Sequence, residues 1–269
     1  MLLTKFLEGR RSTRKFKKEV VDKDILDQLM YYGKKIEEEY GEDRVEFKLF
    51  EEGNKVYSSL KGLGGYAGVM IESPHYIGLQ IDDRDKETVM RAAYSMEELS
   101  TKAEELKLGT CWVNLMEVSE QVKTELLEDK NKKIDYLLAI GYPKEQSKIF
   151  KSTSSRLSIK DIVFYQEWGN VIDMDLLEQR GLNDLFYYVR YAPSNKNNQP
   201  WRFILKNDKV VLAVVNPDNV ENFTDMGIVM YYFTEMAKAI GVNNRWNILD
   251  CNKEAAGDIE YCIVGEYNI

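Results

Sequence analysis

The chain has 269 residues, of which 44% are hydrophobic and 30% are charged. This composition is typical of a soluble globular protein with room for one large domain or two small ones. The formal net charge of −8 repels phosphate backbones, so we expect no nucleic-acid partner. We also expect no membrane segment, because no apolar run approaches the roughly 20 residues of a membrane span, and residues 1–7 are too short for a signal peptide.

Histidine and cysteine content excludes several classes of enzyme. The single His75 follows Pro74 and precedes an apolar run, which predicts a structural role at the start of a strand and excludes a Ser-His-Asp triad or a histidine-rich metal site. Cys111, Cys251 and Cys262 are odd in number and lack metal-site spacing. They suit a reducing compartment, so we expect a cytoplasmic protein without a bound metal.

The first predicted elements are a helix and a strand. Apolar residues from Ile25 to Ile36 fall on one helical face, with Asp22 as the N-cap. The segment Val45–Phe50 is a predicted strand.

The same order recurs in the second half of the chain. Leu26–Tyr32 matches Leu182–Tyr188, and Phe47 matches Phe203 at the same spacing. A strand is expected at Phe203–Leu205.

Two further pairs of segments match in the same order. Tyr94–Gly109 and Met226–Gly241 are both predicted to be long amphipathic helices that end at a glycine C-cap. Ile140–Tyr142 and Val264–Glu266 are each expected in a strand that closes a copy. Three collinear matches indicate an internal duplication, with α+β copies over residues 1–171 and 172–269 that together form one compact unit.

Two segments resemble the signature segments of the FMN-dependent nitroreductase family. They are Arg10–Phe16 (RRSTRKF) and Ala192–Phe203 (APSNKNNQPWRF). The resemblance implies a nitroreductase-like fold in which NADH or NADPH reduces FMN. The flavin then reduces nitroaromatics, quinones or similar acceptors in a ping-pong cycle.

Family members are normally homodimers with FMN between subunits, so this chain resembles such a dimer fused into one pseudo-dimeric chain and then reduced. The first copy has Ile36–Glu39 where the second has Ala192–Asn195. The acidic run Lys35–Asp43 is expected to be a solvated loop that binds no ligand. We therefore expect a monomer with one FMN.

The resemblance assigns the flavin phosphate and ribityl chain to the arginine segment. Arg10, Ser12 and Arg14 alternate along the chain, so they can point the same way from an extended backbone, and guanidinium groups bind phosphate bidentately. Alone, the segment could equally be a solvated basic run. Ser154–Phe164 resembles the family's R-x-P-L-x-x-I-V tail, which makes Arg156 either a second phosphate ligand or a surface arginine before a strand.

The segment Leu108–Asn114 resembles the family's G-L-G-T-C-W-I-G segment, which lies against the flavin ring. By resemblance, the backbone N–H of Val113 or Asn114 bonds to flavin N5. Trp112 is expected in the core and Cys111 is expected to be structural. The alternative is a buried turn from helix to strand.

Pro193, Ser194 and Asn197 are the expected contacts to the ribityl hydroxyls and the pyrimidine edge, whereas Gln199–Trp201 is interpreted as structural. Lys61 is the candidate cation for flavin N1–O2, and the backbone N–H groups of Gly64 and Gly65 are the alternative. No catalytic side chain is expected, because flavin N5 performs hydride transfer. The expected cofactor-binding residues are Arg10, Arg11, Ser12, Arg14, Lys61, Thr110, Cys111, Trp112, Val113, Asn114, Arg156, Pro193, Ser194 and Asn197.

Three alternatives stay open. The protein could bind FMN as a store or redox sensor without turnover. It could be a specialised flavin enzyme, such as a reductive dehalogenase of iodotyrosine type or a flavin-cleaving enzyme, although no long lid insertion is evident. It could also be an interaction protein that has lost flavin, against which the retained polar segments argue.

Overall fold

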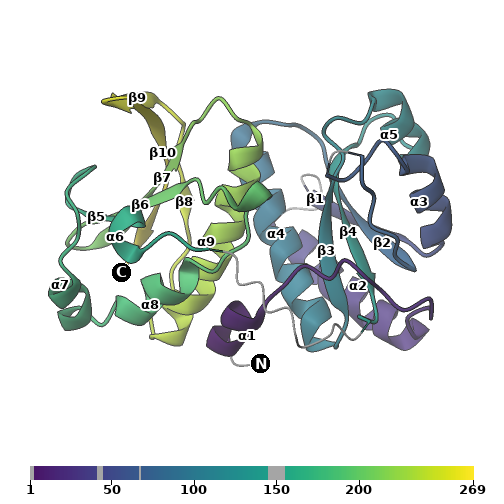
Figure 1. The fold of residues 1–269 in the computed structure, drawn as a ribbon, viewed down its shortest axis with the longest axis horizontal. Coiled ribbons are helices and arrows are strands. Elements are labelled where there is room, and N and C mark those ends of the chain that lie inside the picture. Colours follow the sequence, from purple (N-terminus) through teal and green to yellow (C-terminus); the bar gives the residue numbers. More distant parts are fainter. Residues whose placement is uncertain (1–2, 41–44, 67, 145–154) are drawn as a thin grey trace. The chain divides into compact units, whose positions relative to one another are not determined.

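A computed structural model describes residues 3–40, 45–66, 68–144 and 155–269 (Figure 1). The chain divides into two compact units. Unit 2 is Arg11–Lys151, and unit 1 combines Met1–Arg10 with Ser152–Ile269. The sequence placed the boundary between residues 171 and 172. Residues 1–10 and 152–171, expected in the first copy, belong instead to the same unit as the second copy.

Pairing within unit 1 explains the difference in boundaries. Strand β5 (Val163–Tyr165) pairs in parallel with β6 (Trp201–Leu205). Helix α1 (Leu3–Gly9) packs against α8 (Asn183–Val189). Both contacts join segments that are distant in sequence, and local patterns do not reveal them.

Unit 2 is an antiparallel sheet in the order β1-β2-β4-β3, with helices on both faces (Figure 1). One core contains side chains of α2 and α4, and the other contains side chains of α3 and α5. Successive residues of β4 point to opposite cores, as the pleat requires. The elements are α2 (Lys23–Tyr40), β1 (Val45–Phe50), α3 (Gly53–Leu60), β2 (His75–Ile81), α4 (Lys86–Glu105), β3 (Gly109–Asn114), α5 (Glu120–Leu127) and β4 (Lys133–Gly141).

Unit 1 contains a sheet in the order β5-β6-β7-β10-β8, with β9 paired to β10. Helix α9 is buried along most of its length and packs on α8, β6 and β7. The remaining elements are α6 (Ile159–Ile162), α7 (Met174–Gln179), the 3₁₀ turn η1 (Asn195–Asn197), β7 (Lys209–Val215), α9 (Glu221–Ala239), β8 (Asn247–Ile248), β9 (Lys253–Ala256) and β10 (Ile259–Asn268).

The two units share an internal topology. The order β6-β7-β10-β8 repeats β1-β2-β4-β3, and all of these pairings are antiparallel. A helix precedes the first strand in each unit, and a long helix follows the second strand. The predicted equivalents Phe47 and Phe203 are both buried on the first strand, at 4% and 0% exposed. The fold is therefore of the expected α+β class, with a helix before the first strand in each unit.

The ends of the long helices correct one prediction. Gly241 follows α9 with φ of +86°, and Val242 N–H bonds to the Ala237 carbonyl, so the glycine is the expected cap. Helix α4 ends with the same bonding pattern, from Leu108 N–H to the Ala103 carbonyl, but the left-handed residue is Lys107. Gly109 is therefore not a cap, and it already belongs to β3.

The acidic run after α2 is also different from the prediction. Residues 35–40 are the last turns of α2 rather than a loop. Glu37 is buried, and its carboxylate accepts hydrogen bonds from Phe47 N–H (2.7 Å) and Lys34 Nζ (2.6 Å). Residues 41–43 of the run lie outside the described part of the chain.

His75 has the predicted structural role at the start of β2. Its Nε2 accepts from Val21 N–H (3.0 Å), and Nδ1 lies 2.8 Å from the Glu51 carbonyl. Burial lowers the pKa of His75, which suits a neutral ring that accepts at one nitrogen and donates at the other.

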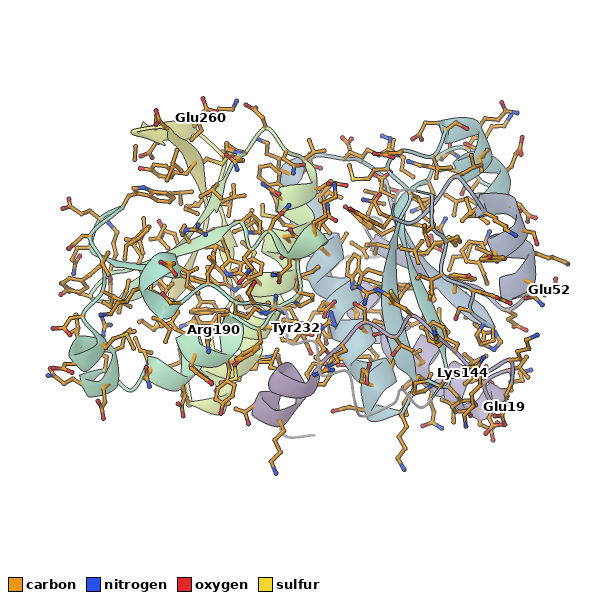
Figure 2. All side chains as sticks on the ribbon, in the orientation of Figure 1. Glu19, Glu52, Lys144, Arg190, Tyr232 and Glu260 are labelled. Carbon is orange, nitrogen blue, oxygen red and sulfur yellow. A yellow bond between two sulfur atoms is a disulfide. The ribbon has the colours of Figure 1, made fainter. Side chains whose placement is uncertain are left out.

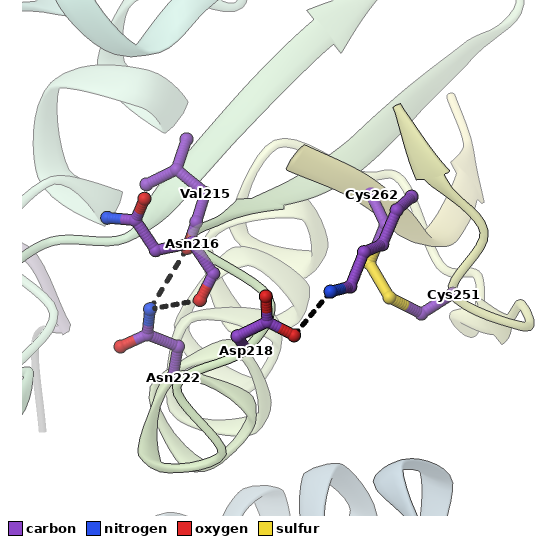
Figure 3. Close-up of a disulfide and its surroundings, with 7 residues drawn as sticks. Val215, Asn216, Asp218, Asn222, Cys251 and Cys262 are labelled. Carbon is purple, nitrogen blue, oxygen red and sulfur yellow. Dashed lines mark hydrogen bonds and ion pairs between the residues drawn. A yellow bond between two sulfur atoms is a disulfide. The ribbon is translucent and has the colours of Figure 1, made fainter. Parts of the chain in front are cut away.

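The cysteines do not behave as the sequence suggested. Cys251 and Cys262 form a disulfide beside β9 and β10 (Figure 3), so the argument from cysteine content to a reducing compartment loses its basis. Cys111 is buried, consistent with the predicted structural role. In the described ranges, none of the helices has the length and apolarity needed to span a membrane.

Candidate functional site

Arg156 is the centre of a polar cluster in unit 1. Its Nη1 donates to Asn197 Oδ1, and its Nη2 donates to the Tyr191 carbonyl at 3.1 Å. Its Nε is buried and has no hydrogen-bond partner among the described residues. A half-buried guanidinium with an unused donor is costly unless a ligand supplies the missing acceptor.

Positive charges gather around this guanidinium. Burial lowers the pKa of Arg156, and the charges of Arg10 and Arg190 lower it further. Among the described residues, none of the groups that shift this pKa is a carboxylate. Because arginine stays charged in proteins, the positive charges of Arg10 and Arg190 beside Arg156 favour an anion at this site.

Arg190, at the end of α8, was not predicted (Figure 2). Its guanidinium lies over the rings of Tyr187 and Tyr191, at 4.5 and 5.0 Å from the centroids. It donates to the Tyr187 carbonyl (3.1 Å) and the Tyr191 hydroxyl (3.3 Å). The tyrosines therefore hold a cation beside Arg156 without neutralising it. The only sequence signal was an arginine two residues before Ala192.

The loop from Ser194 to Gln199 supplies Asn197 to the cluster. Lys196, Asn197 and Gln199 have φ of +50°, +60° and +49°, a left-handed conformation that costs free energy in residues other than glycine. Ser194 Oγ accepts from Gln199 N–H (3.0 Å), and Asn197 Nδ2 donates to the Ser155 carbonyl (2.8 Å). A strained, internally bonded loop of this kind is typical of a binding site.

The tail around Arg156 departs from the family pattern for a local reason. Ser158 is the N-cap of α6 in a capping box with Asp161, where the resemblance led us to expect proline. Leu157 N–H donates to Gln199 Oε1 at 2.9 Å, so Gln199 ties this tail to the loop and has the structural role predicted for it. Arg156 is half-buried and precedes a helix, which contradicts the alternative of a surface arginine before a strand. Ser154 lies outside the described residues.

In unit 2 the arginine segment runs along the outer edge of β3. Thr13 N–H donates to the Thr110 carbonyl at 2.7 Å. A Cβ on Gly109 would lie 2.4 Å from Thr13 Oγ1, so glycine is required for this approach. Ser12 is half-buried, whereas Arg11 and Arg14 are exposed.

The direction of the β3 backbone distinguishes Val113 from Asn114 as the expected N–H donor to flavin N5. The carbonyls of Thr110 and Asn114 accept from Thr13 and Gly65, so both point away from β4. In a strand the N–H and C=O of one residue lie on the same side and alternate between neighbours. The N–H of Asn114 is therefore on the outer edge, and the N–H of Val113 points towards β4.

The side chains of β3 are largely engaged within unit 2. Trp112 is half-buried rather than fully in the core, and its Nε1 donates to Glu97 at 2.7 Å. Thr110 is buried, with its hydroxyl 3.0 Å from Ser100 Oγ. Cys111 and Val113 are also buried, so these residues support the strand.

Lys61 is exposed, with its Nζ 5.8 Å from the centroid of the Tyr57 ring. The alternative donors to flavin N1–O2 have partners within the unit. Gly64 N–H bonds to the Leu60 carbonyl (2.9 Å), and Gly65 N–H bonds to the Asn114 carbonyl (2.8 Å). This favours Lys61 over the two glycines.

The residues expected from sequence thus form two sets. Unit 1 brings Arg10, Arg156 and the loop of Pro193, Ser194 and Asn197 into one cluster. Unit 2 brings residues 11–16 of the arginine segment, β3 and the Lys61 turn together. Sequence reasoning missed Arg190 and Tyr191.

Comparison with known proteins agrees with this fold. Residues 3–237 match the model of a family described as "Putative TM nitroreductase". A Thermotoga maritima crystal structure described as a nitroreductase has a TM-score of 0.59 and 17% identity, with 98% of this chain and 94% of that chain covered. No curated protein matches significantly.

Shorter structures match part of the chain. An FMN-dependent nitroreductase of Clostridium difficile has 23% identity and a TM-score of 0.46, covering 55% of this chain and 91% of its own. A Bacteroides fragilis nitroreductase with bound FMN has 16% identity and a TM-score of 0.46, covering 59% and 100%.

Proposed function

We propose that this chain, which belongs to the nitroreductase family, is an FMN-dependent oxidoreductase. The observation that carries the proposal is the Arg156 cluster in unit 1. A half-buried guanidinium with an unused donor stands beside two further guanidinium charges. The FMN phosphate, with a charge of about −1.5 to −2 near pH 7 and three acceptor oxygens, fits this donor set.

The proposed roles follow from the contacts of each side chain. Arg10 and Arg156 bind the phosphate, and Arg190 contributes charge from between its tyrosines. Asn197 orients Arg156, because its amide oxygen accepts from that guanidinium while its amide nitrogen bonds to Ser155. Ser194 and Pro193 shape the loop for the ribityl chain.

We assign further cofactor contacts to unit 2 on the basis of the family resemblance and the geometry of β3. Asn114, whose N–H lies on the outer edge of the strand, is the proposed donor to flavin N5, and Val113 is not. Ser12, Arg14 and Lys61 remain proposed cofactor contacts. Lys61 would stabilise negative charge on the flavin.

Bound FMN would supply hydride chemistry, taking electrons from NADH or NADPH and passing them to nitroaromatics, quinones or similar acceptors. The side chains of this chain hold the cofactor and set its charge, and no general acid or base is needed. We also propose that the shared topology of the two units reflects an internal duplication, and that the chain is a monomer with one FMN.

Kinetics separates this proposal from its alternative, an FMN store or redox sensor. The FMN-loaded protein should consume NADH or NADPH steadily when menadione or nitrofurazone is added, and Arg10→Ala should be mostly colourless. Full flavin occupancy with no turnover for either acceptor would favour the store. Full occupancy in Arg10→Ala would overturn the phosphate assignment.

A further inference from the structure

Asp225 on α9 is a buried carboxylate beside the loop of unit 1. It is 2% exposed, and its Oδ1 accepts from Asn195 N–H at 2.9 Å. Its Oδ2 is buried and has no hydrogen-bond partner within the described ranges of the chain. An ionised carboxylate with so few partners costs stability, which indicates a role other than holding the core together.

Asp225 connects to the anion cluster through the strained loop. Asn195 also donates from Nδ2 to Glu221, one turn earlier on α9, at 2.5 Å. Two residues later, Asn197 accepts from Arg156. The left-handed residues of this loop need outside anchors, and Asp225 and Arg156 supply one at each end.

We propose that Asp225 is a positioning residue that holds the Ser194–Gln199 loop for cofactor binding, and that its ionisation weakens binding of the FMN phosphate. The inference rests on the proposed function. It adds a dependence of FMN binding on the protonation of Asp225, whose hydrogen bond goes to the loop at Asn195.

The surroundings of Asp225 make this ionisation accessible near neutral pH. Burial raises the pKa of Asp225 to about 8, the Asn195 N–H opposes the rise, and the charge of Glu221 adds to it. The elements packed against α9 carry five charged groups near this region. Arg190 lies over its tyrosine rings, Arg202 donates to the Gln199 and Trp201 carbonyls, and Lys209 pairs with Glu266. The other two, Asp184 and Lys196, are exposed side chains.

Electrostatics gives the direction of the effect. Protonated Asp225 is neutral, whereas ionised Asp225 places a negative charge beside a loop that serves an anion. Inside a protein, one such charge is expected to weaken binding of a dianion by roughly threefold to tenfold.

The test is the FMN dissociation constant of the flavin-free chain, measured by flavin fluorescence between pH 6.5 and 9.5. The phosphate has its second pKa at about 6 and is largely dianionic in this window. In the wild type, the dissociation constant should rise by about threefold to tenfold through pH 8. Asp225→Asn keeps an oxygen acceptor without the charge, so its profile should be flat. Asp184→Asn, a matched exposed control, should follow the wild type.

The outcomes separate the inference from the proposed function. Identical profiles in wild type and Asp225→Asn, or tighter wild-type binding at high pH, would overturn the role of Asp225 alone. Absence of FMN binding by the wild type at pH 7 would overturn the proposed function and this inference together. Asp225→Ala removes the acceptor and should bind weakly at every pH. If that variant does not fold, the pH profiles of the wild type and Asp225→Asn still test the role of Asp225.

Discussion

Two helix-to-strand connections with the same topology differ in a way that locates the candidate site. In unit 2, α2 continues to Tyr40, and Glu37 places its carboxylate against Phe47 N–H with both oxygens bonded. In unit 1, α8 ends at Val189, and the chain opens into a strained loop. Asp225 accepts from the Asn195 N–H of that loop with one oxygen, and its other oxygen has no partner in the part of the chain that the structure describes.

The comparison contrasts two regions with different polar chemistry. In unit 2, both carboxylate oxygens of Glu37 are bonded, and among the described residues of that unit no buried guanidinium nitrogen lacks a partner. The connection in unit 1 keeps a cationic cluster, left-handed residues and a buried acid, each of which costs stability. Destabilising groups of this kind are typical of functional sites, where a ligand interacts with them.

The largest expected effect is the loss of flavin from Arg156→Ala. Each charge-assisted contact contributes about 1.5–3 kcal/mol, so FMN affinity should fall by roughly tenfold to a hundredfold. The measurement is a fluorescence titration of the flavin-free protein. Arg180→Ala is the matched control, because Arg180 in the same unit bonds to the Lys206 and Asn207 carbonyls. Equal losses in both variants would contradict the account.

The second effect is the pH dependence of stability in Asp225→Asn. The raised pKa means that the folded chain keeps a proton which the unfolded chain, with an aspartate pKa of about 3.9, releases. Wild-type stability should therefore fall with pH from about 4 to about 8, by at most about 1.4 kcal/mol per pH unit. Denaturation at pH 5, 6.5 and 8 should show a growing advantage for Asp225→Asn, and a constant difference would contradict the assignment.

Glu37→Ala should destabilise unit 2 and leave FMN binding intact. Removal of the acceptor leaves Phe47 N–H buried and unbonded, which costs about 1–3 kcal/mol. Glu37→Gln keeps an acceptor and should recover part of the loss. Urea denaturation followed by circular dichroism measures the difference. Loss of flavin from Glu37→Ala without a loss of stability would contradict a purely structural role for Glu37.

The smallest expected effect is a gain in stability from Lys196→Gly. Lys196 is exposed with φ of +50°, a conformation that glycine adopts with less strain. The gain should be below about 1 kcal/mol, because glycine also adds freedom to the unfolded chain. Thermal unfolding measures it, and a clear destabilisation would mean that the lysine conformation is not strained.

Local patterns predicted the elements that depend on local chemistry. The alternation of Val45–Phe50 predicted β1 with its observed bounds, and the glycine after α9 predicted that helix end. Charge alone made residues 35–43 resemble a loop, yet a bond from a distant strand turns Glu37 inward. Lys107 replaces a glycine at the end of α4 because the backbone bonds there do not depend on the side chain.

The candidate site was only partly predictable. Arg10, Arg156 and Asn197 were found through motif resemblance, and the structure of unit 1 gathers them. Arg190 and Asp225 depend on tertiary packing, since one lies between tyrosine rings and the other beneath a loop on a different element. The Cys251–Cys262 disulfide likewise depends on how β10 meets the segment before β9.

The most direct test of the central claim is the number of FMN molecules bound per chain. Titration of the flavin-free protein, followed by its visible spectrum and mass analysis of the released flavin, should give one FMN per chain. That result would agree with one site at the Ser194–Gln199 loop of unit 1 and no second site at the end of α2 in unit 2. Two FMN per chain would contradict a single site, and none would contradict the assignment of FMN to the Arg156 cluster.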